Sequence, residues 1–318
     1  MRPLRALLLM AAATLLIAGC GATEQASPPA AAPGPTVVAS TNVYGAIARA
    51  VGGERITVMS VITDPAADPH SYESTPADAV EVARADLVVR NGGGYDDFMT
   101  RLVETAGGTP TVVDASEVSG LVADEKAGDE HADEHGHEHG AFNEHVWYSF
   151  PTVQKVADRI AAGLAALDPA GATGYTANAR TFAEQVGQLE QKAAAIRTGA
   201  PGARVAVTEP LPGYLLQAAG LTDVTPPEFT EAVEEDTDPP AAAVAQTMAL
   251  LQGPEKVRAL VVNAQTATPT TQQIRAAADA GGVPVVEMTE TLPEGQADYV
   301  SWMTGQVDAL ASAVGAPR

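Results

Sequence analysis

Four side chains of the kinds that bind transition metals stand just after predicted strands or just before a predicted helix. The imidazoles are His70 in TDPAADPHSYE and His145 in NEHVWYSFP, and the carboxylates are Glu209 in VAVTEPLPGY and Glu290 in VPVVEMTETLP. Such a set suits a divalent transition ion better than Mg²⁺ or Ca²⁺, which prefer all-oxygen shells. Because two of these residues lie in each half of the chain, they predict a metal site in a cleft between two lobes.

Each of these residues also has a purely structural interpretation. His70 could be a loop histidine on the surface, and His145 could be a hydrogen-bonded histidine of the core. A carboxylate that directly follows a strand is often the N-cap of the next helix, which would account for Glu209 and Glu290. Three further glutamates compete with them as ligands: Glu228, Glu231 and Glu287. The combination of residues, rather than any single member, therefore indicates metal binding.

A second group of histidines lies in the acidic stretch DEHADEHGHEHG, residues 129–140. Its members alternate with Asp and Glu: His131, His135, His137 and His139. Weak, exchangeable imidazole ligands of this sort suit zinc or copper better than manganese. Since the Gly, Asp and Glu content offers no packing face, residues 125–140 are predicted to form a solvated loop that captures metal or senses its abundance. The alternative is an acidic insertion with no specific role.

The elements that must position the four residues form two series of alternating strands and helices. Predicted strands cover residues 36–41, 56–63, 85–90, 109–114, 204–208, 257–263 and 283–289. Predicted helices cover residues 43–51, 76–83, 95–105, 151–167, 169–196 and 298–314, with Pro151 and Pro169 in first-turn positions. This pattern predicts an α/β fold with two βα lobes, mainly parallel sheets and one long linker helix. Ligands of such sheets bind at the carboxyl ends of the strands, where loops converge, and the four residues stand at junctions between predicted elements.

The N-terminus has the features of a bacterial lipoprotein signal. Arg2 and Arg5 precede an apolar run from Leu7 to Ile17, and IAGC places small residues before Cys20, the only cysteine. We expect cleavage before Cys20, acylation of its thiol and a location outside the cell membrane. An uncleaved anchor is the alternative. The predicted boundaries are a signal peptide at 1–19, a Pro- and Ala-rich flexible tether at 20–35, an N-terminal lobe at 36–168, a linker helix at 169–198 and a C-terminal lobe at 199–318.

Charge and motifs exclude several classes of protein. The formal net charge of −22 disfavours nucleic acid and favours cations. The chain has no H-E-x-x-H, no G-x-S-x-G, no Walker loop and no G-x-G-x-x-G at a strand–helix junction. Four protein ligands would also close a zinc site that a hydrolase keeps open for water. We therefore expect a binding protein rather than an enzyme, with a zinc hydrolase as the remote alternative.

Several segments, taken in order, resemble the zinc- and manganese-binding receptors of bacterial ABC importers. They are the IAGC lipobox, DPHSYESTPADAVEVARADLVVRNGGGYDDFM, the histidine-rich insertion, EHVWYSFPTVQKVADRIAAGL, VTEPLPGYLLQAAGL and PVVEMTETLPEGQADYVSWM. The resemblance runs from about Val37 to the C-terminal helix. It implies two βα lobes joined by one long helix, here residues 169–197, with the metal between the lobes.

The resemblance also implies a role for each of the four residues. His70 takes the first ligand position, in the D-P-H-x-Y/F-E pattern, and His145 takes the second, in H-x-W. Glu209 falls at the third position, where zinc-type members often carry histidine and manganese-type members carry glutamate. Glu290 falls at the fourth, where aspartate is commoner. These two departures leave the identity of the metal open.

The function expected from these observations is extracytoplasmic metal capture. The protein, a monomer held to the membrane through Cys20, binds Zn²⁺ and delivers it to an ABC permease and its ATPase. Two alternatives stay open at this point. One is a Mn²⁺ or Fe²⁺ receptor of the same family, and the other is a surface metal buffer or adhesin that never docks to a transporter.

Overall fold

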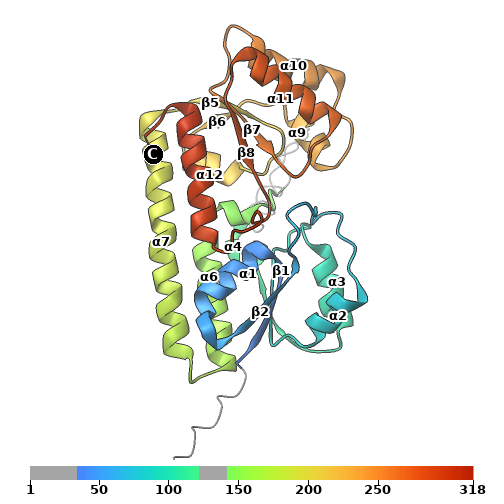
Figure 1. Cartoon of the computed structure of the whole chain (residues 1–318), viewed down its shortest axis with the longest axis vertical. Helices are drawn as coiled ribbons and strands as arrows, with labels where there is room; N and C mark the ends of the chain where they lie inside the picture. Colours follow the sequence, from blue (N-terminus) through green and yellow to red (C-terminus); the bar gives the residue numbers. More distant parts are fainter. Residues whose placement is uncertain (1–33, 122–141, 318) are drawn as a thin grey trace, which may run out of the picture. The chain divides into compact units, whose positions relative to one another are not determined.

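The computed structural model describes residues 34–121 and 142–317. It contains two four-stranded sheets in which every pair of neighbouring strands is parallel. The first sheet has the order β2-β1-β3-β4 and the second has the order β6-β5-β7-β8 (Figure 1). The predicted α/β fold with two parallel sheets is therefore confirmed.

The first sheet is buried on both faces because its strands are almost continuously apolar. On β1, Val37 and Ala39 face one core cluster, and Val38 between them faces another. Helices α1 and α6 cover one face of this sheet, and α2 and α3 cover the other (Figure 1). The elements of this half are β1 (Thr36–Thr41), α1 (Asn42–Gly52), η1 (Gly53–Arg55), β2 (Thr57–Ile62), α2 (Pro76–Ala83), β3 (Leu87–Arg90), α3 (Asp97–Thr105), β4 (Thr111–Asp114), α4 (Ala115–Ser119), η3 (Val146–Tyr148) and α6 (Phe150–Leu167).

The second sheet repeats this arrangement. Val205 and Val207 of β5 face the core cluster that also contains Val37, while Ala206 faces a separate cluster with α9, α10 and α11. One core therefore continues through both halves. The elements of this half are β5 (Arg204–Val207), α8 (Gly213–Ala218), β6 (Thr222–Asp223), α9 (Pro227–Glu234), α10 (Ala241–Gln252), β7 (Ala259–Asn263), α11 (Pro269–Gly281), β8 (Val285–Met288) and α12 (Tyr299–Val314).

The long helix α7 (Ala172–Gly199) packs against elements of both halves. It contacts α1 and α6 from the first half and α8 and α12 from the second. Its buried side chains include Phe182, Val186 and Leu189, which recur at helical spacing and belong to the shared core.

The start of α7 differs from the expectation that Pro169 opens the helix. Pro169 lies in the turn before α7, where its carbonyl accepts from the N–H of Ala172 at 3.4 Å. The N–H of Gly171 donates to the carbonyl of Asp168 at 3.0 Å, so a turn precedes the first residue of the helix. Pro151, by contrast, lies in the first turn of α6 as expected.

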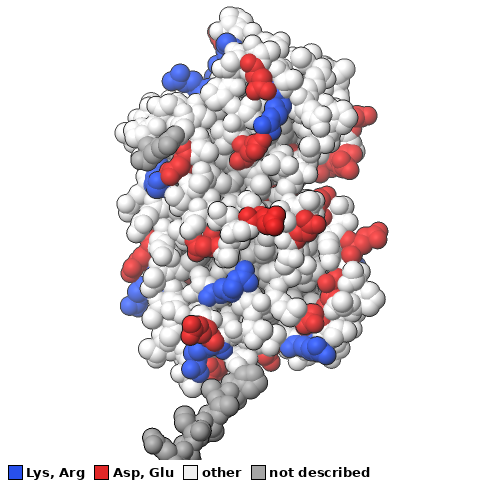
Figure 2. Space-filling model, in the orientation of Figure 1, with Lys and Arg blue, Asp and Glu red and all other residues white. Residues whose placement is uncertain are grey.

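The surface charges are dispersed, and the described helices are not of the membrane-spanning type. Acidic side chains are spread over the visible face rather than gathered in one patch, with Lys and Arg between them (Figure 2). Within residues 34–121 and 142–317, no helix combines the length and the apolar character needed to cross a membrane. The predicted signal peptide, Cys20 and most of the tether lie outside the described residues.

Candidate metal site

His145 is held rigidly in the short segment that precedes η3. Its side chain is fully buried, and its Nδ1 lies 2.8 Å from Oδ1 of Asn143. The amide of Asn143 is oriented by its own Nδ2, which donates to the carbonyl of Pro210 at 2.9 Å. Because an amide oxygen only accepts, Nδ1 of His145 carries the proton of the neutral ring, and in that form Nε2 has a free lone pair. That tautomer is the one in which Nε2 can bind a metal.

His70 brings a second imidazole to the same point from the loop after β2. Its side chain is 26% exposed, and its ring meets Tyr95 edge to face with centroids 4.8 Å apart. The backbone N–H of His70 donates to Oδ1 of Asp68 at 2.9 Å, which stabilises the turn that presents the ring. The rings of His70 and His145 have centroids 6.1 Å apart. The structure therefore brings together the two predicted histidines, 75 positions apart in the chain.

The acidic residue nearest to both imidazoles is Glu234, which sequence reasoning missed. Oε1 of Glu234 lies 3.3 Å from Nε2 of His70 and 3.3 Å from Nε2 of His145. Its side chain is 15% exposed and comes from the last residue of α9. Among the described residues, these three side chains form one group whose ligand atoms all lie within 4.8 Å of one another.

A sequence signal for Glu234 existed but was weak. The buried face of α9 contains Phe229 and Val233, and Glu234 borders it. A carboxylate at the edge of an apolar helix face points toward the core boundary. The three glutamates named as competitors, Glu228, Glu231 and Glu287, are exposed instead. Glu287 pairs with Arg275 at the surface.

Glu209 and Glu290 each lie two positions after the last residue of a strand, β5 and β8, and one side chain links them. Nδ2 of Asn263, at the end of β7, donates to Oε2 of Glu209 at 2.6 Å and to Oε1 of Glu290 at 2.7 Å. The order β5-β7-β8 places the three strand ends side by side, so the central Asn263 reaches both carboxylates. Neither glutamate is an N-cap, because Pro212 caps α8 and Asp298 caps α12.

Two hydroxyl groups complete the surroundings of these carboxylates. Oγ1 of Thr266 donates to Oε1 of Glu209, and the hydroxyl of Tyr95 donates to Oε2 of Glu290 at 3.0 Å. Tyr95 belongs to the first half and Glu290 to the second, so this hydrogen bond joins the two halves beside the histidines. Glu209 and Glu290 are both almost completely buried.

A pocket of about 250 Å³ connects these groups. His70, Glu209, Glu234 and Glu290 line it together with Asp68, Val233, Asp236, Gln265, Thr266, Ala267 and Thr268. Within the part of the chain that the structure describes, a second group of possible ligands contains Asp68, His70 and Glu290. Glu209 belongs to neither group, so it lines the pocket without approaching both imidazoles.

Raised pKa values in the pocket favour the protonated forms of Glu209, Glu290 and His70. Burial raises the pKa of Glu209 to about 7 and also raises the pKa of Glu290. Burial acts against the imidazolium form of His70, but the carboxylates of Glu234 and Glu290 outweigh it and raise that pKa to about 9. Burial would raise the pKa of Glu234, yet the two imidazoles lower it to about 2. A divalent ion would supply the positive charge that protons supply here.

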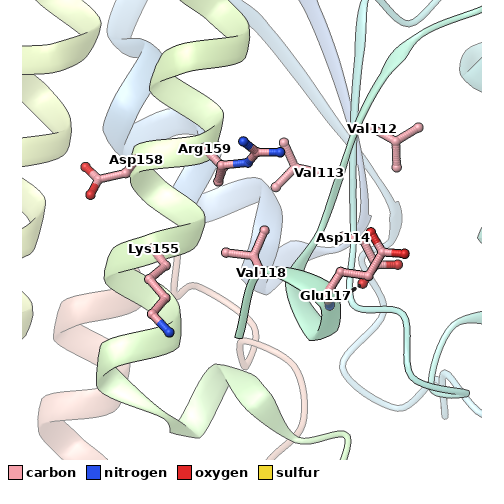
Figure 3. Close-up of a pocket in the computed structure, with 8 residues that line it drawn as sticks. All are labelled: Val112, Val113, Asp114, Glu117, Val118, Lys155, Asp158 and Arg159. Atoms are coloured by element: carbon pink, nitrogen blue, oxygen red, sulfur yellow. Dashed lines mark hydrogen bonds between the residues drawn. The ribbon is translucent and has the colours of Figure 1, made fainter. Parts of the chain in front are cut away.

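A larger pocket of about 550 Å³ lies elsewhere, between β4, α4 and α6 (Figure 3). It is lined by apolar and mixed-charge side chains: Val112, Val113, Asp114, Glu117, Val118, Lys155, Asp158 and Arg159. Asp114 already accepts from Arg90, and Nζ of Lys155 donates to the carbonyl of Ser119. Because it contains no imidazole and its signs of charge are mixed, it does not suit a transition metal.

Five predicted functional residues cannot be placed. Residues 125–140, with His131, His135, His137 and His139, and the N-terminal Cys20 lie outside the described residues.

Two parallel-sheet halves, with candidate ligands from both meeting in one pocket, are the features of a two-lobed ligand-binding protein. The chain belongs to the family described as zinc-uptake complex component A, periplasmic, which matches residues 37–313. The family resemblance read from the sequence is thereby confirmed.

Solved structures share this fold. The periplasmic zinc-binding protein TroA from Treponema pallidum superposes with a TM-score of 0.70 at 18% identity, covering 88% of this chain and 99% of that one. The substrate-binding protein FpvC from Pseudomonas aeruginosa, in complex with Mn²⁺, gives a TM-score of 0.68 at 22% identity, covering 89% of this chain and 98% of that one. At these identities the likeness establishes the fold.

Curated relatives are similar over part of the chain. The manganese-binding lipoprotein MntA of Halalkalibacterium halodurans is 29% identical over 177 residues, which is 56% of this chain and 54% of that protein. The high-affinity zinc uptake system protein ZnuA of Bacillus subtilis is 28% identical over 192 residues, which is 59% of this chain and 58% of that protein. The chain thus spans about half the length of the curated relatives that it matches.

Proposed function

We propose that this protein captures a divalent transition metal ion in the pocket that His70, Glu209 and Glu290 line, with His145 as the buried second imidazole. The observation that supports this most directly is the convergence of Nε2 of His70 and Nε2 of His145 on one carboxylate oxygen, at 3.3 Å each. Imidazoles so placed, with carboxylates around them, form a ligand set for Zn²⁺, Mn²⁺ or Fe²⁺.

Zn²⁺ is the ion we propose first. Two imidazoles and the histidine-rich segment favour a borderline ion, and the family description names zinc uptake. The relatives differ among themselves: one is named for manganese, one for zinc and one, YfeA of Yersinia pestis, for iron. Glutamate at positions 209 and 290 is compatible with each ion, so Mn²⁺ or Fe²⁺ is the second candidate.

We propose further that the protein acts as a receptor for an ABC importer. A relative named as a metal ABC transporter substrate-binding lipoprotein supports a permease and an ATPase as partners. Two relatives named as lipoproteins support an anchor at Cys20 outside the cell membrane. The protein works as a monomer and makes or breaks no covalent bond. Residues 36–168 and 199–318 act as the two lobes, residues 169–198 link them, and residues 125–140 supply weaker sites.

Metal analysis and competition test this proposal. The mature protein, purified without an affinity tag, is expected to contain about one equivalent of a transition metal and to bind Zn²⁺ more tightly than Mn²⁺ in a chelator competition. His70→Ala and His145→Ala are each expected to abolish tight binding. A tight site that survives in the double variant would refute the assignment, and metal-dependent hydrolysis lost in His145→Ala would favour an enzyme instead.

A further inference from the structure

We propose that Glu234 is itself a metal ligand, supplied by α9 to the same ion as His70 and His145. This inference rests on the proposed function, because it names a member of the site that binds the metal. It goes beyond the four residues predicted from the sequence, which did not include Glu234.

The spacing of the three ligand atoms fits a shared ion. Oε1 of Glu234 is 3.3 Å from each imidazole Nε2. Two ligand atoms that are about 2.0 to 2.1 Å from Zn²⁺ at tetrahedral angles lie about 3.3 to 3.4 Å apart. Both measured distances therefore equal an edge of a zinc coordination tetrahedron. The third pair, formed by ligand atoms of the two histidines, lies within 4.8 Å, so all three atoms are close enough to approach one ion.

These atoms also lack other partners. Nε2 of His145 and both carboxylate oxygens of Glu234 are buried, and apart from the 3.3 Å contacts of Oε1 with the two histidines they have no hydrogen-bond partner within the described residues. Buried polar atoms in native proteins are nearly always satisfied by protein, water or a bound ion. His145 is fully buried and its Nε2 lies 3.3 Å from Oε1 of Glu234, so the two side chains face one another. A cation between them would satisfy these atoms.

Glu209 and Glu290 differ from Glu234 in this respect. Each of their carboxylate oxygens accepts a hydrogen bond, from Thr266 and Asn263 for Glu209 and from Tyr95 and Asn263 for Glu290. A carboxylate oxygen of Glu290 still lies within 4.8 Å of a ring nitrogen of His70, so Glu290 is within reach as a further ligand. Glu234 is therefore the carboxylate most available to the two histidines.

Ligation by Glu234 has a structural consequence. His70 and His145 belong to the half before α7, and Glu234 ends a helix of the half after it. A metal bound by all three would fasten α9 to two loops of the opposite half. Loading the site would then restrain α9, which the four predicted residues alone would not do.

Glu234→Gln tests the inference, with Glu235→Gln as a matched control. Both variants remove one negative charge from adjacent positions, but Glu235 is exposed. Affinity for Zn²⁺ is measured by competition with a chromophoric chelator, and the visible absorption of Co²⁺ bound to the same protein reports the number and type of ligands. Glu234→Gln is expected to weaken Zn²⁺ binding by at least about 100-fold, the upper end of the cost of losing an outer-shell partner. It is also expected to alter the Co²⁺ spectrum, and Glu235→Gln is expected to change neither.

Each other outcome has a defined meaning. Unchanged affinity and spectrum in Glu234→Gln would overturn the inference, and so would weaker binding with an unchanged spectrum, which would show an electrostatic role at a distance. Should Glu234→Gln fail to fold, Glu234→Asp keeps the charge, shortens the side chain and is judged by the same two readouts. If the wild-type protein binds neither Zn²⁺ nor Co²⁺, the proposed function fails rather than the role of Glu234.

Discussion

Asn143 and His145 form a coupled pair in which a single amide oxygen fixes the imidazole. Oδ1 of Asn143 accepts from the backbone N–H of His145 at 3.0 Å and lies 2.8 Å from Nδ1 of its ring. This arrangement determines the tautomer and directs Nε2 toward the pocket. Asn143 is thus a positioning residue for the proposed metal ligand.

Replacing Asn143 is expected to weaken metal binding without abolishing it. Asn143→Ala removes the acceptor of Nδ1, so the ring of His145 can rotate or exchange tautomers. Loss of such an outer-shell partner typically lowers metal affinity by about 10- to 100-fold. Chelator competition for Zn²⁺ measures the change, and an affinity equal to that of the wild-type protein would contradict the positioning role.

The affinity for metal is expected to fall as the pH falls below about 9. The carboxylates around His70 raise its pKa to about 9, and the pKa of His145 is also raised. Since only the deprotonated imidazole binds a metal, protons compete throughout this range and are released on binding. Calorimetry in buffers of different ionisation enthalpy would count the protons. Equal affinity at about pH 5 and about pH 7.5 would contradict ligation by histidine.

The metal-free protein is expected to lose stability as the pH rises from mild acid to mild alkali. The pKa of Glu209 rises from 4.5 to about 7 on folding, so the folded state binds more protons between those values and its stability falls across them. The pKa of His70 rises from 6.5 to about 9, which continues the decline. Glu234, with its pKa lowered from 4.5 to about 2, acts in the opposite sense only in stronger acid.

Thermal denaturation in the presence of EDTA measures this effect. The melting temperature is expected to be higher at about pH 5.5 than at about pH 9, with added Zn²⁺ removing the decline because the ion replaces the protons. His70→Ala should flatten the upper part of the profile. A melting temperature that rises steadily with pH would be inconsistent with these shifted pKa values.

Gln265 is expected to control how long the metal stays bound. Its Nε2 donates to the carbonyl of Pro65 at 2.7 Å, in the loop that leads to His70, and its Oε1 accepts from the backbone N–H of Glu290 at 2.6 Å. Gln265→Ala removes this tie between the halves and should lower affinity about tenfold. Stopped-flow transfer to a chelator should show faster release, while the exposed Gln272→Ala on α11 should behave as wild type.

Deleting residues 125–140 is expected to remove weak metal sites and leave one tight site. The four histidines of this segment are separate from the pocket residues in sequence, and weak imidazole ligands add capacity rather than affinity. Isothermal titration of the deletion variant should show a single equivalent with wild-type affinity. Loss of the tight site in this variant would show that the segment contributes to it.

The sequence by itself determined the sheets and two members of the candidate site. Strands such as Leu87–Arg90 and Ala259–Asn263 are buried on both faces, so they appear as short apolar runs that periodicity can find. His70 and His145 were identifiable because they stand at element ends and within family motifs. β6, at Thr222–Asp223, is too short to leave such a pattern, and Pro169 was misplaced because the turn at Asp168 precedes α7.

Only the tertiary structure decided which carboxylates meet the histidines. Asn263 joins Glu209 to Glu290 because the strand order puts β7 between β5 and β8, and strand order is a consequence of long-range packing. Glu234 meets both imidazoles because α9 packs against the second sheet with its last residue facing the loops of the first half. Helical periodicity could place Glu234 at the edge of a buried face. Which side chains lie across from that edge depends on how the two halves pack, and no local pattern contains that information.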